Sequence, residues 1–154
     1  MTDSHPRYLA PGWVTRHVMN PTIAGLTRAG ISIWGSRELR VRGRTSGLWR
    51  SVPVNVLSLD GQRYLVAPRG QTQWVQNLRV AGGGELRVGA RVETFSAVEL
   101  PDTDKVPVLR GYLKRWKAEV GIFFAASAKS SDADLLRIAP DHPVFLVTVR
   151  PAQQ

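Results

Sequence analysis

The chain has 154 residues and a formal net charge of +9, which arises from 21 Lys and Arg residues against 12 Asp and Glu residues. This length suits a single domain, and a hydrophobic content of 43% is enough to build a core, which excludes a disordered protein. The chain contains no cysteine. Disulfides, a thiolate nucleophile and Cys-ligated metals are therefore excluded, and a reducing, cytoplasmic location is expected.

The positive charge is confined to the first part of the chain. Residues 1–91 contain 13 Arg and four acidic residues, whereas residues 92–154 contain eight basic and eight acidic residues. Every basic residue of the first segment is Arg, which is the better planar, bidentate partner of phosphate and carboxylate groups. A basic, solvated surface explains this distribution, and so does a site for a multiply anionic partner.

The N-terminal part is predicted to hold a tail and two short helices. Residues 1–11 are expected to form a flexible tail, and residues 12–154 a single domain. Asn20-Pro21 is typical of a helix start, with Asn as the N-cap and Pro at the first helical position. Gly30 can end that helix, and residues 13–19 are a candidate for a shorter helix before it.

The rest of the chain has the pattern of antiparallel strands separated by a few helices. Asp60-Gly61 lies between two apolar runs and is a strong hairpin signal, and Gly89-Ala90 marks a second hairpin. Strands are predicted over residues 39–43, 52–59, 62–67, 85–88, 91–98 and 144–149. Helices are predicted over residues 73–80, 105–120 and 132–138, the first capped by Thr72 and closed by Gly82-Gly83-Gly84. The pattern predicts an α+β fold, a small barrel of about six antiparallel strands with flanking helices.

Two loops that carry Gly and Arg are the candidate binding elements. Gly43-Arg-Thr-Ser-Gly47, followed by Arg50, can offer backbone N–H groups, hydroxyls and guanidinium groups to an anion. Taken alone, this segment is better explained as an ordinary basic hairpin loop. Ala67-Pro-Arg-Gly70 follows one predicted strand and precedes the helix that holds Trp74, and helix N-termini favour anions. Two such loops at the ends of consecutive strands can converge on one ligand.

The order and context of these motifs resemble one family. The matching segments are Gly43-Arg-Thr-Ser-Gly-Leu-Trp-Arg-Ser-Val-Pro53, the turn at Asp60-Gly61, Ala67-Pro-Arg-Gly70 and Trp74-Val-Gln-Asn-Leu78. They look like those of the deazaflavin (coenzyme F420)-dependent nitroreductase family, a branch of the flavin/deazaflavin oxidoreductases with a split β-barrel fold similar to that of FMN-binding split barrels. The resemblance covers roughly residues 35–100.

The resemblance implies cofactor-binding positions on the first loop, the strand after it, the second loop and the following helix. These positions are Arg44, Thr45, Ser46, Arg50, Pro53, Val54, Ala67, Pro68, Arg69, Gly70, Trp74 and Asn77. The first four match a loop that binds the phosphate and acidic tail of F420, and the next two match the strand beside the deazaflavin ring. Thr45 and Arg69 stand where many members carry Lys, so the first loop has one positive charge fewer.

The acceptor side of the site is predicted from aromatic residues in the neutral half of the chain. Trp116, Phe123 and Phe124 are candidates for the wall of a pocket for a planar, hydrophobic acceptor such as a quinone. The helical spacing of Trp116 favours core packing as the competing interpretation. His5 and His17 are far from His142 in the sequence and have no carboxylate partner at ligand spacing, so no metal site is predicted. The sequence identifies no catalytic residue.

The resemblance implies an F420H2-dependent oxidoreductase that transfers a hydride to a quinone, a nitro compound or an activated alkene, with the hydride chemistry supplied by the cofactor. The alternatives are an FMN-binding split-barrel oxidoreductase and a cofactor-binding protein without catalysis. A nucleic-acid-binding barrel is less favoured, because the sequence lacks the exposed aromatic pattern of a base-stacking surface. The expected partner is a small-molecule acceptor and no nucleic acid; a peripheral membrane contact, and a monomer or a homodimer, stay open.

Overall fold

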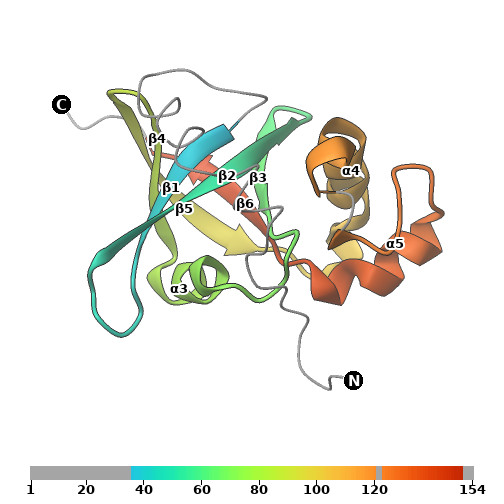
Figure 1. Cartoon of the computed structure of the whole chain (residues 1–154), viewed down its shortest axis with the longest axis horizontal. Helices are drawn as coiled ribbons and strands as arrows, with labels where there is room; N and C mark the ends of the chain where they lie inside the picture. Colours follow the sequence, from blue (N-terminus) through green and yellow to red (C-terminus); the bar gives the residue numbers. More distant parts are fainter. Residues whose placement is uncertain (1–35, 121–122, 151–154) are drawn as a thin grey trace.

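The computed structural model of the chain describes residues 36–120 and 123–150 (Figure 1). Six strands form a closed barrel in the order β1-β2-β3-β6-β5-β4, and every neighbouring pair is antiparallel. The strands are β1 (Ser36–Arg42), β2 (Trp49–Leu59), β3 (Gln62–Val66), β4 (Gly83–Val88), β5 (Arg91–Glu99) and β6 (Val144–Val149). The predicted six-stranded antiparallel barrel with flanking helices is confirmed, while the predicted tail and helices of residues 1–30 lie outside the described residues.

Three α-helices and two 3-10 turns are described around the barrel. They are α3 (Gln73–Ala81), η1 (Asp102–Asp104), α4 (Val106–Val120), α5 (Asp132–Ile138) and η3 (Ala139–Asp141). In Figure 1, α3 lies below the barrel near the β1–β2 hairpin, whereas α4 and α5 lie together on the other side. No helix of the described ranges is long and apolar enough to cross a membrane.

Several boundaries differ from the sequence prediction by one to three residues, and β1 begins at Ser36 rather than at residue 39. Two of the differences bear on the hairpin and on α3. β2 begins at Trp49, three residues before the predicted start, because Trp49, Arg50 and Ser51 pair with β1 up to Arg42. The β1–β2 hairpin therefore projects beyond the barrel (Figure 1). At the end of α3 only Gly82 closes the helix, with a φ of 72° and its N–H donated to the Leu78 carbonyl, and β4 already begins at the next residue.

The barrel interior holds one hydrophobic cluster. Its buried members come from all six strands, from α3 and, in the case of Ala67, from the loop after β3: Leu39, Val41, Val54, Leu65, Ala67, Val75, Leu78, Leu86, Phe95, Phe145 and Val147. Because α3 contributes Val75 and Leu78, the helix is fixed against the barrel by burial of its apolar face. The start of α3 is thereby held at a defined place relative to the hairpin.

A second cluster fills the space between the outer barrel surface and α4 and α5. Leu57, Val66 and Val144 face outward from β2, β3 and β6 and contribute to this cluster. The remaining fully buried members are Val108, Leu109, Tyr112, Leu113, Trp116, Phe124, Leu135, Ile138 and Ala139. This layer covers the side of the barrel away from the projecting hairpin (Figure 1).

Candidate functional site

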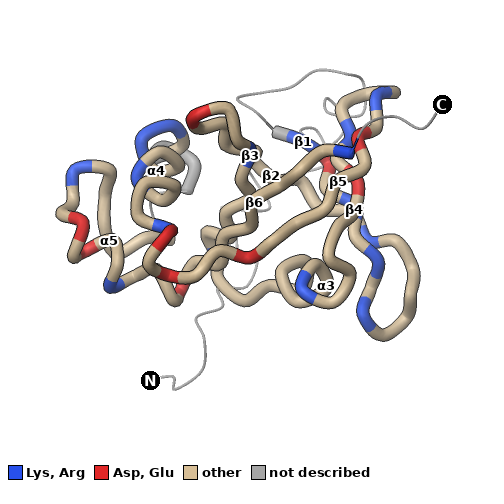
Figure 2. The backbone as a smooth tube through the Cα atoms, turned by 180° about the vertical axis from the view of Figure 1, so that it is seen from behind, with Lys and Arg blue, Asp and Glu red and all other residues tan. Residues whose placement is uncertain are grey.

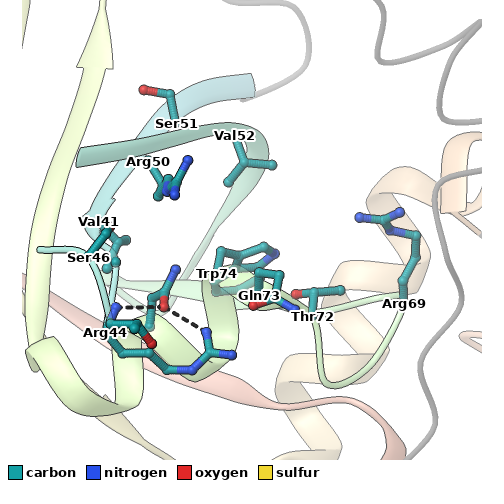
Figure 3. A pocket seen from close by; sticks show the side chains of 13 residues that line it. Val41, Arg44, Ser46, Arg50, Ser51, Val52, Arg69, Thr72, Gln73 and Trp74 are labelled. Carbon is teal, nitrogen blue, oxygen red and sulfur yellow. Dashed lines mark hydrogen bonds between the residues drawn. The ribbon is translucent and has the colours of Figure 1, made fainter. Parts of the chain in front are cut away.

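A cavity of about 610 Å³ lies between the β1–β2 hairpin and the start of α3 (Figure 3). The hairpin forms one wall, and α3 with the loop before it forms the other. The lining residues are Val41, Gly43, Arg44, Thr45, Ser46, Arg50, Ser51, Val52, Arg69, Thr72, Gln73, Trp74 and Asn77. Arginine, hydroxyl and amide side chains supply the polar and cationic part of the lining, and Val41, Val52 and Trp74 supply the apolar part.

The hairpin loop between β1 and β2 is held by its own hydrogen bonds. Gly43 donates its N–H to the Leu48 carbonyl at 2.8 Å, and Gly47 donates its N–H to the Gly43 carbonyl at 2.9 Å. The hydroxyl of Ser46 accepts the N–H of Leu48 at 3.1 Å. Gly47 adopts a φ of 73°, which glycine reaches without strain. The loop therefore has a defined conformation. It presents Arg44 and leads into β2, which carries Arg50.

The outer face of the hairpin is stiffened by stacking. The guanidinium groups of Arg40 and Arg42 lie 4.9 Å and 4.5 Å from the centre of the Trp49 ring. Side chains alternate along a strand, so Trp49 faces away from the cavity when its neighbour Arg50 faces into it. Figure 2 shows that basic residues lie along the hairpin. The stacked outer face supports the inner face that lines the cavity.

Asn77 joins the two walls of the cavity. Its side-chain oxygen accepts the backbone N–H of Arg44 at 3.0 Å and the Nη1 of the same residue at 2.8 Å. Both bonds are drawn in Figure 3, where Arg44 bends towards α3. Asn77 is only 5% exposed, whereas Arg44 is exposed, so the two bonds are buried at their amide end and open to solvent on the arginine side. The amide thus fixes the loop and the guanidinium of Arg44 relative to the helix.

The second loop connects β3 to α3 and is tied to the chain before β6. Ala67 donates its N–H to the Pro143 carbonyl at 2.9 Å, and its carbonyl lies 3.2 Å from His142 Nδ1. Gly70 has a φ of 90° and donates to the Ala67 carbonyl at 3.2 Å, which closes a tight turn. This turn places Arg69 beside the start of α3, on the cavity wall (Figure 3).

Seven of the twelve predicted cofactor positions line the cavity. They are Arg44, Thr45, Ser46, Arg50, Arg69, Trp74 and Asn77. The other five, Pro53, Val54, Ala67, Pro68 and Gly70, lie outside the lining, and Val54 and Ala67 are buried in the barrel core. These five positions hold the two cavity-lining segments in place through β2 and the second loop. The role of each position as a cofactor ligand stays a prediction.

Six further lining residues are not among the twelve predicted cofactor positions, although Gly43 belongs to the predicted first loop: Val41, Gly43, Ser51, Val52, Thr72 and Gln73. Val41 and Arg50 are opposite each other in the β1–β2 register, so the period of two in a strand places both on one face. That register is set by the length of the hairpin loop, which the apolar pattern alone does not fix. Thr72 was identified only as a helix cap.

The three predicted acceptor residues are remote from this cavity. Trp116 is 1% exposed and Phe124 is 8% exposed, and both belong to the cluster between the barrel and α4 and α5. Phe124 stacks on His142 with ring centres 4.0 Å apart. Phe123 is partly buried against the same cluster. Their placement favours core packing over contact with a molecule in the cavity, and the acceptor role stays a prediction.

Within residues 36–120 and 123–150, no group of three or more His, Asp or Glu side chains is arranged to hold a metal ion. The residues that line the cavity supply guanidinium, hydroxyl, amide and apolar groups. Guanidinium groups from separate loops at the start of a helix form an environment for a phosphate or carboxylate, and the apolar part suits a planar ring system.

Solved structures of other proteins share this fold. A structure described as a domain-swapped dimer is 18% identical, with a TM-score of 0.54, and the match covers 88% of this chain and 97% of that chain. An F420-H2-dependent reductase, FDR-A, is 18% identical with a TM-score of 0.52, over 74% of this chain and 94% of that chain. Protein Atu2129 of unknown function from Agrobacterium tumefaciens is 13% identical with a TM-score of 0.57, over 97% of this chain and 60% of that chain.

These identities establish a shared fold and no more. No protein with a curated description matches the sequence. The model of one protein family, described as F420H(2)-dependent quinone reductase, matches residues 26–121, which is more than half of the chain and includes both walls of the cavity. The chain therefore belongs to the F420H(2)-dependent quinone reductase family, whose cofactor is coenzyme F420.

Proposed function

We propose that this F420-dependent reductase transfers a hydride to a quinone, and that F420H2 binds in the cavity between the β1–β2 hairpin and α3. Nitro compounds and activated alkenes are further acceptors for the same hydride chemistry. The presence of Arg44 and Arg50 from the β1–β2 hairpin and Arg69 from the loop before α3 around one cavity with an apolar wall carries the proposal. Membership of the quinone reductase family supports the quinone as the first acceptor to test.

The cavity residues fit the chemistry of the cofactor. F420 carries a phosphate and an oligoglutamate tail, and the three guanidinium groups would hold these anionic parts by charge-assisted hydrogen bonds. Val41, Val52 and Trp74 supply apolar surface against which a planar ring can pack. The Trp74 ring is itself supported by Phe145, with ring centres 6.1 Å apart, so that wall is preformed.

The reduced deazaflavin supplies the hydride when it is bound, and the protein binds, orients and shields the reactants. Reduction of a quinone to a quinol also needs a proton. The described residues that line the cavity are Arg, Ser, Thr, Asn, Gln, Trp, Val and Gly. None of these side chains releases a proton readily near neutral pH. We therefore assign the proton to water that reaches the open side of the cavity.

The two arginines that flank the cavity give the first test. Arg50→Ala and Arg69→Ala are each expected to weaken F420 binding by about 10- to 100-fold, because a charge-assisted hydrogen bond contributes roughly 1.5–3 kcal/mol. Arg137→Ala is the matched control, since Arg137 is exposed on α5 and bonded to Asp134, and α5 lies away from the hairpin (Figure 1). Titration followed by deazaflavin fluorescence gives the three Kd values. Equal Kd values in all three variants would place the cofactor elsewhere.

The acceptor is tested by turnover of the purified protein. Oxidation of F420H2 is followed by absorbance with a soluble quinone, a nitroaromatic compound or an enone present at equal concentration, and FMNH2 replaces F420H2 in parallel. We expect the largest kcat/KM with F420H2 and the quinone. Binding of F420 without turnover of any acceptor would support a cofactor-binding protein without catalysis.

Asn77 is expected to act on the cofactor through Arg44. Asn77→Leu keeps the buried volume but removes the acceptor of both Arg44 bonds, so we expect weaker F420 binding, about tenfold, at the scale of one lost bond to a charged group. If Asn77 acts only through Arg44, Asn77→Leu has little further effect in an Arg44→Ala background. A double-mutant cycle of F420 Kd values measures this coupling. Additive losses would indicate that Asn77 and Arg44 contribute independently.

The proposal extends to the oligomeric state of the protein and to its location in the cell. A homodimer is the assembly to test first, because one protein of the same fold is a domain-swapped dimer. A cytoplasmic protein with a peripheral membrane contact would reach a quinone dissolved in the bilayer. Light scattering in solution and sedimentation with lipid vesicles address the two points separately.

A further inference from the structure

Thr72 stands at the N-cap of α3 but does not cap the helix. Its backbone has φ −77° and ψ 173°, the extended conformation typical of an N-cap, yet its side chain makes no capping hydrogen bond. The residue is 4% exposed, and its Oγ1 has no hydrogen-bond partner among the described residues. A buried hydroxyl without a hydrogen-bond partner is unfavourable. At an N-cap, such a hydroxyl usually accepts a hydrogen bond from a backbone N–H in the first turn of the same helix.

The position of Thr72 suggests what its hydroxyl is for. The residue lines the cavity between Arg69 and Trp74, and Figure 3 shows it on the wall that faces Arg50 across the cavity. The first N–H groups of a helix have no intrahelical acceptor, and the first turn of α3 contains no acidic side chain. The partial positive charge of this nine-residue helix is therefore directed at the cavity, to whose lining Arg69 also contributes.

We propose that the Thr72 hydroxyl donates a hydrogen bond to a phosphate oxygen of F420 at the start of α3. A donor beside a helix N-terminus and an arginine is matched to an anion, so the phosphate fits this place better than a ring nitrogen or carbonyl does. The hydroxyl, Arg69 and the free N–H groups of α3 then form one phosphate site. Thr72 is a binding residue of the cofactor rather than a helix cap. This inference rests on the proposed binding of F420 in the cavity.

The experiment compares Thr72→Val and Thr72→Ser with the unchanged protein. Val has the shape of Thr without the hydroxyl, and Ser keeps the hydroxyl. Each protein is titrated with F420 and with the corresponding deazaflavin riboside, which lacks the phosphate and the tail, and the melting temperature of each cofactor-free protein is measured. We expect Thr72→Val to weaken F420 binding by about tenfold, at the lower end of the range for a hydrogen bond to a charged group.

The remaining affinities and the melting temperature are expected to change little. Thr72→Val is expected to bind the riboside as the unchanged protein does, Thr72→Ser to retain most of the F420 affinity, and the melting temperature of cofactor-free Thr72→Val not to fall. An unchanged Kd of Thr72→Val for F420, with F420 still bound, overturns the inference and leaves the proposed function intact. If Thr72→Val loses affinity equally for F420 and for the riboside, the hydroxyl contacts the ring system rather than the phosphate. If the melting temperature of Thr72→Val falls while its Kd for F420 is unchanged, the hydroxyl caps the helix. Absence of F420 binding in the unchanged protein overturns both proposals.

Discussion

Gly84→Ala is expected to lower the free energy of unfolding by about 3 kcal/mol or more, at the upper end of the cost of overpacking a core. A Cβ atom on Gly84 would lie 2.3 Å from the carbonyl oxygen of Arg40 in β1, and 3.4 Å from a methyl group of Val41. The first neighbour is backbone within the barrel, so it cannot move without shifting β1. β4 and β1 approach this closely only because the residue has no side chain.

The same substitution should also weaken F420 binding in the protein that remains folded. Val41 lines the cavity, and the strand that carries it leads directly into the hairpin loop with Arg44. A displaced β1 therefore moves one wall of the cavity relative to α3. Urea unfolding measures the stability, and fluorescence titration at low temperature measures the Kd. A stable Gly84→Ala protein with unchanged affinity would contradict the close packing of β1 and β4.

Gly111→Ala is the matched control for this prediction. A Cβ atom on Gly111, within α4, would meet only side-chain atoms of Leu57 and Leu59, at 3.5 Å or more. Such distances are ordinary contacts, and Ala is favoured over Gly inside a helix by up to about 1 kcal/mol. We therefore expect Gly111→Ala to keep or raise the free energy of unfolding. The opposite signs of the two Gly→Ala changes separate packing from a general effect of the substitution.

Trp116→Ala is expected to lower the free energy of unfolding by about 3–5 kcal/mol, the usual range for removing a buried Trp. Trp116 is 1% exposed, and its ring packs on that of Tyr112 with centres 5.0 Å apart. The removal of the ring leaves a cavity between α4 and the barrel, and the packed helices and strands around it cannot close that cavity. Chemical unfolding followed by circular dichroism measures the change.

The conservative change Trp116→Phe separates a core role from contact with the acceptor. It keeps most of the buried ring, so the protein should fold and retain the KM for the quinone of the unchanged protein. Phe123→Ala is a useful companion, because Phe123 is only partly buried and a change there should affect stability less. A higher KM for the quinone in Trp116→Phe, at unchanged affinity for F420, would return Trp116 to the acceptor site.

The strands were predictable because their signals are local. Asp60-Gly61 between two apolar runs specified the β2–β3 hairpin, and Asp60 indeed has a φ of 52° and Gly61 a φ of 77°. The start of β2 was not predictable, because Trp49 and Ser51 are exposed and are ordered by pairing with β1 and by stacking with two arginines. Gly83 and Gly84 were assigned to the end of a helix, since glycine is depleted in strands; the close approach of neighbouring strands requires them.

The candidate site was predictable in part for the same reason. The two loops and the elements that follow them carry compact sequence motifs, and seven of the predicted residues from these segments line the cavity. What the sequence could not show is the relation between the loops, because Asn77 and Arg44 are 33 positions apart and meet only in the folded barrel. The unpartnered hydroxyl of Thr72 is likewise a property of packing, since the same residue in a similar sequence could cap its helix.

The length of the β1–β2 hairpin has one more consequence, for the solubility of the protein. β1 pairs with β4 only over Glu38–Arg40, and β2 pairs with β3 only over Val56–Leu59, so among the described strands the outer part of the hairpin has two open edges. Open edges are templates for association with another chain, and charged side chains on them oppose it. Arg42, Arg44 and Arg50 give this outer part a like charge in every copy. Two of the arginines proposed to bind the anionic cofactor, Arg44 and Arg50, are thus also expected to oppose pairing between the hairpins of neighbouring molecules.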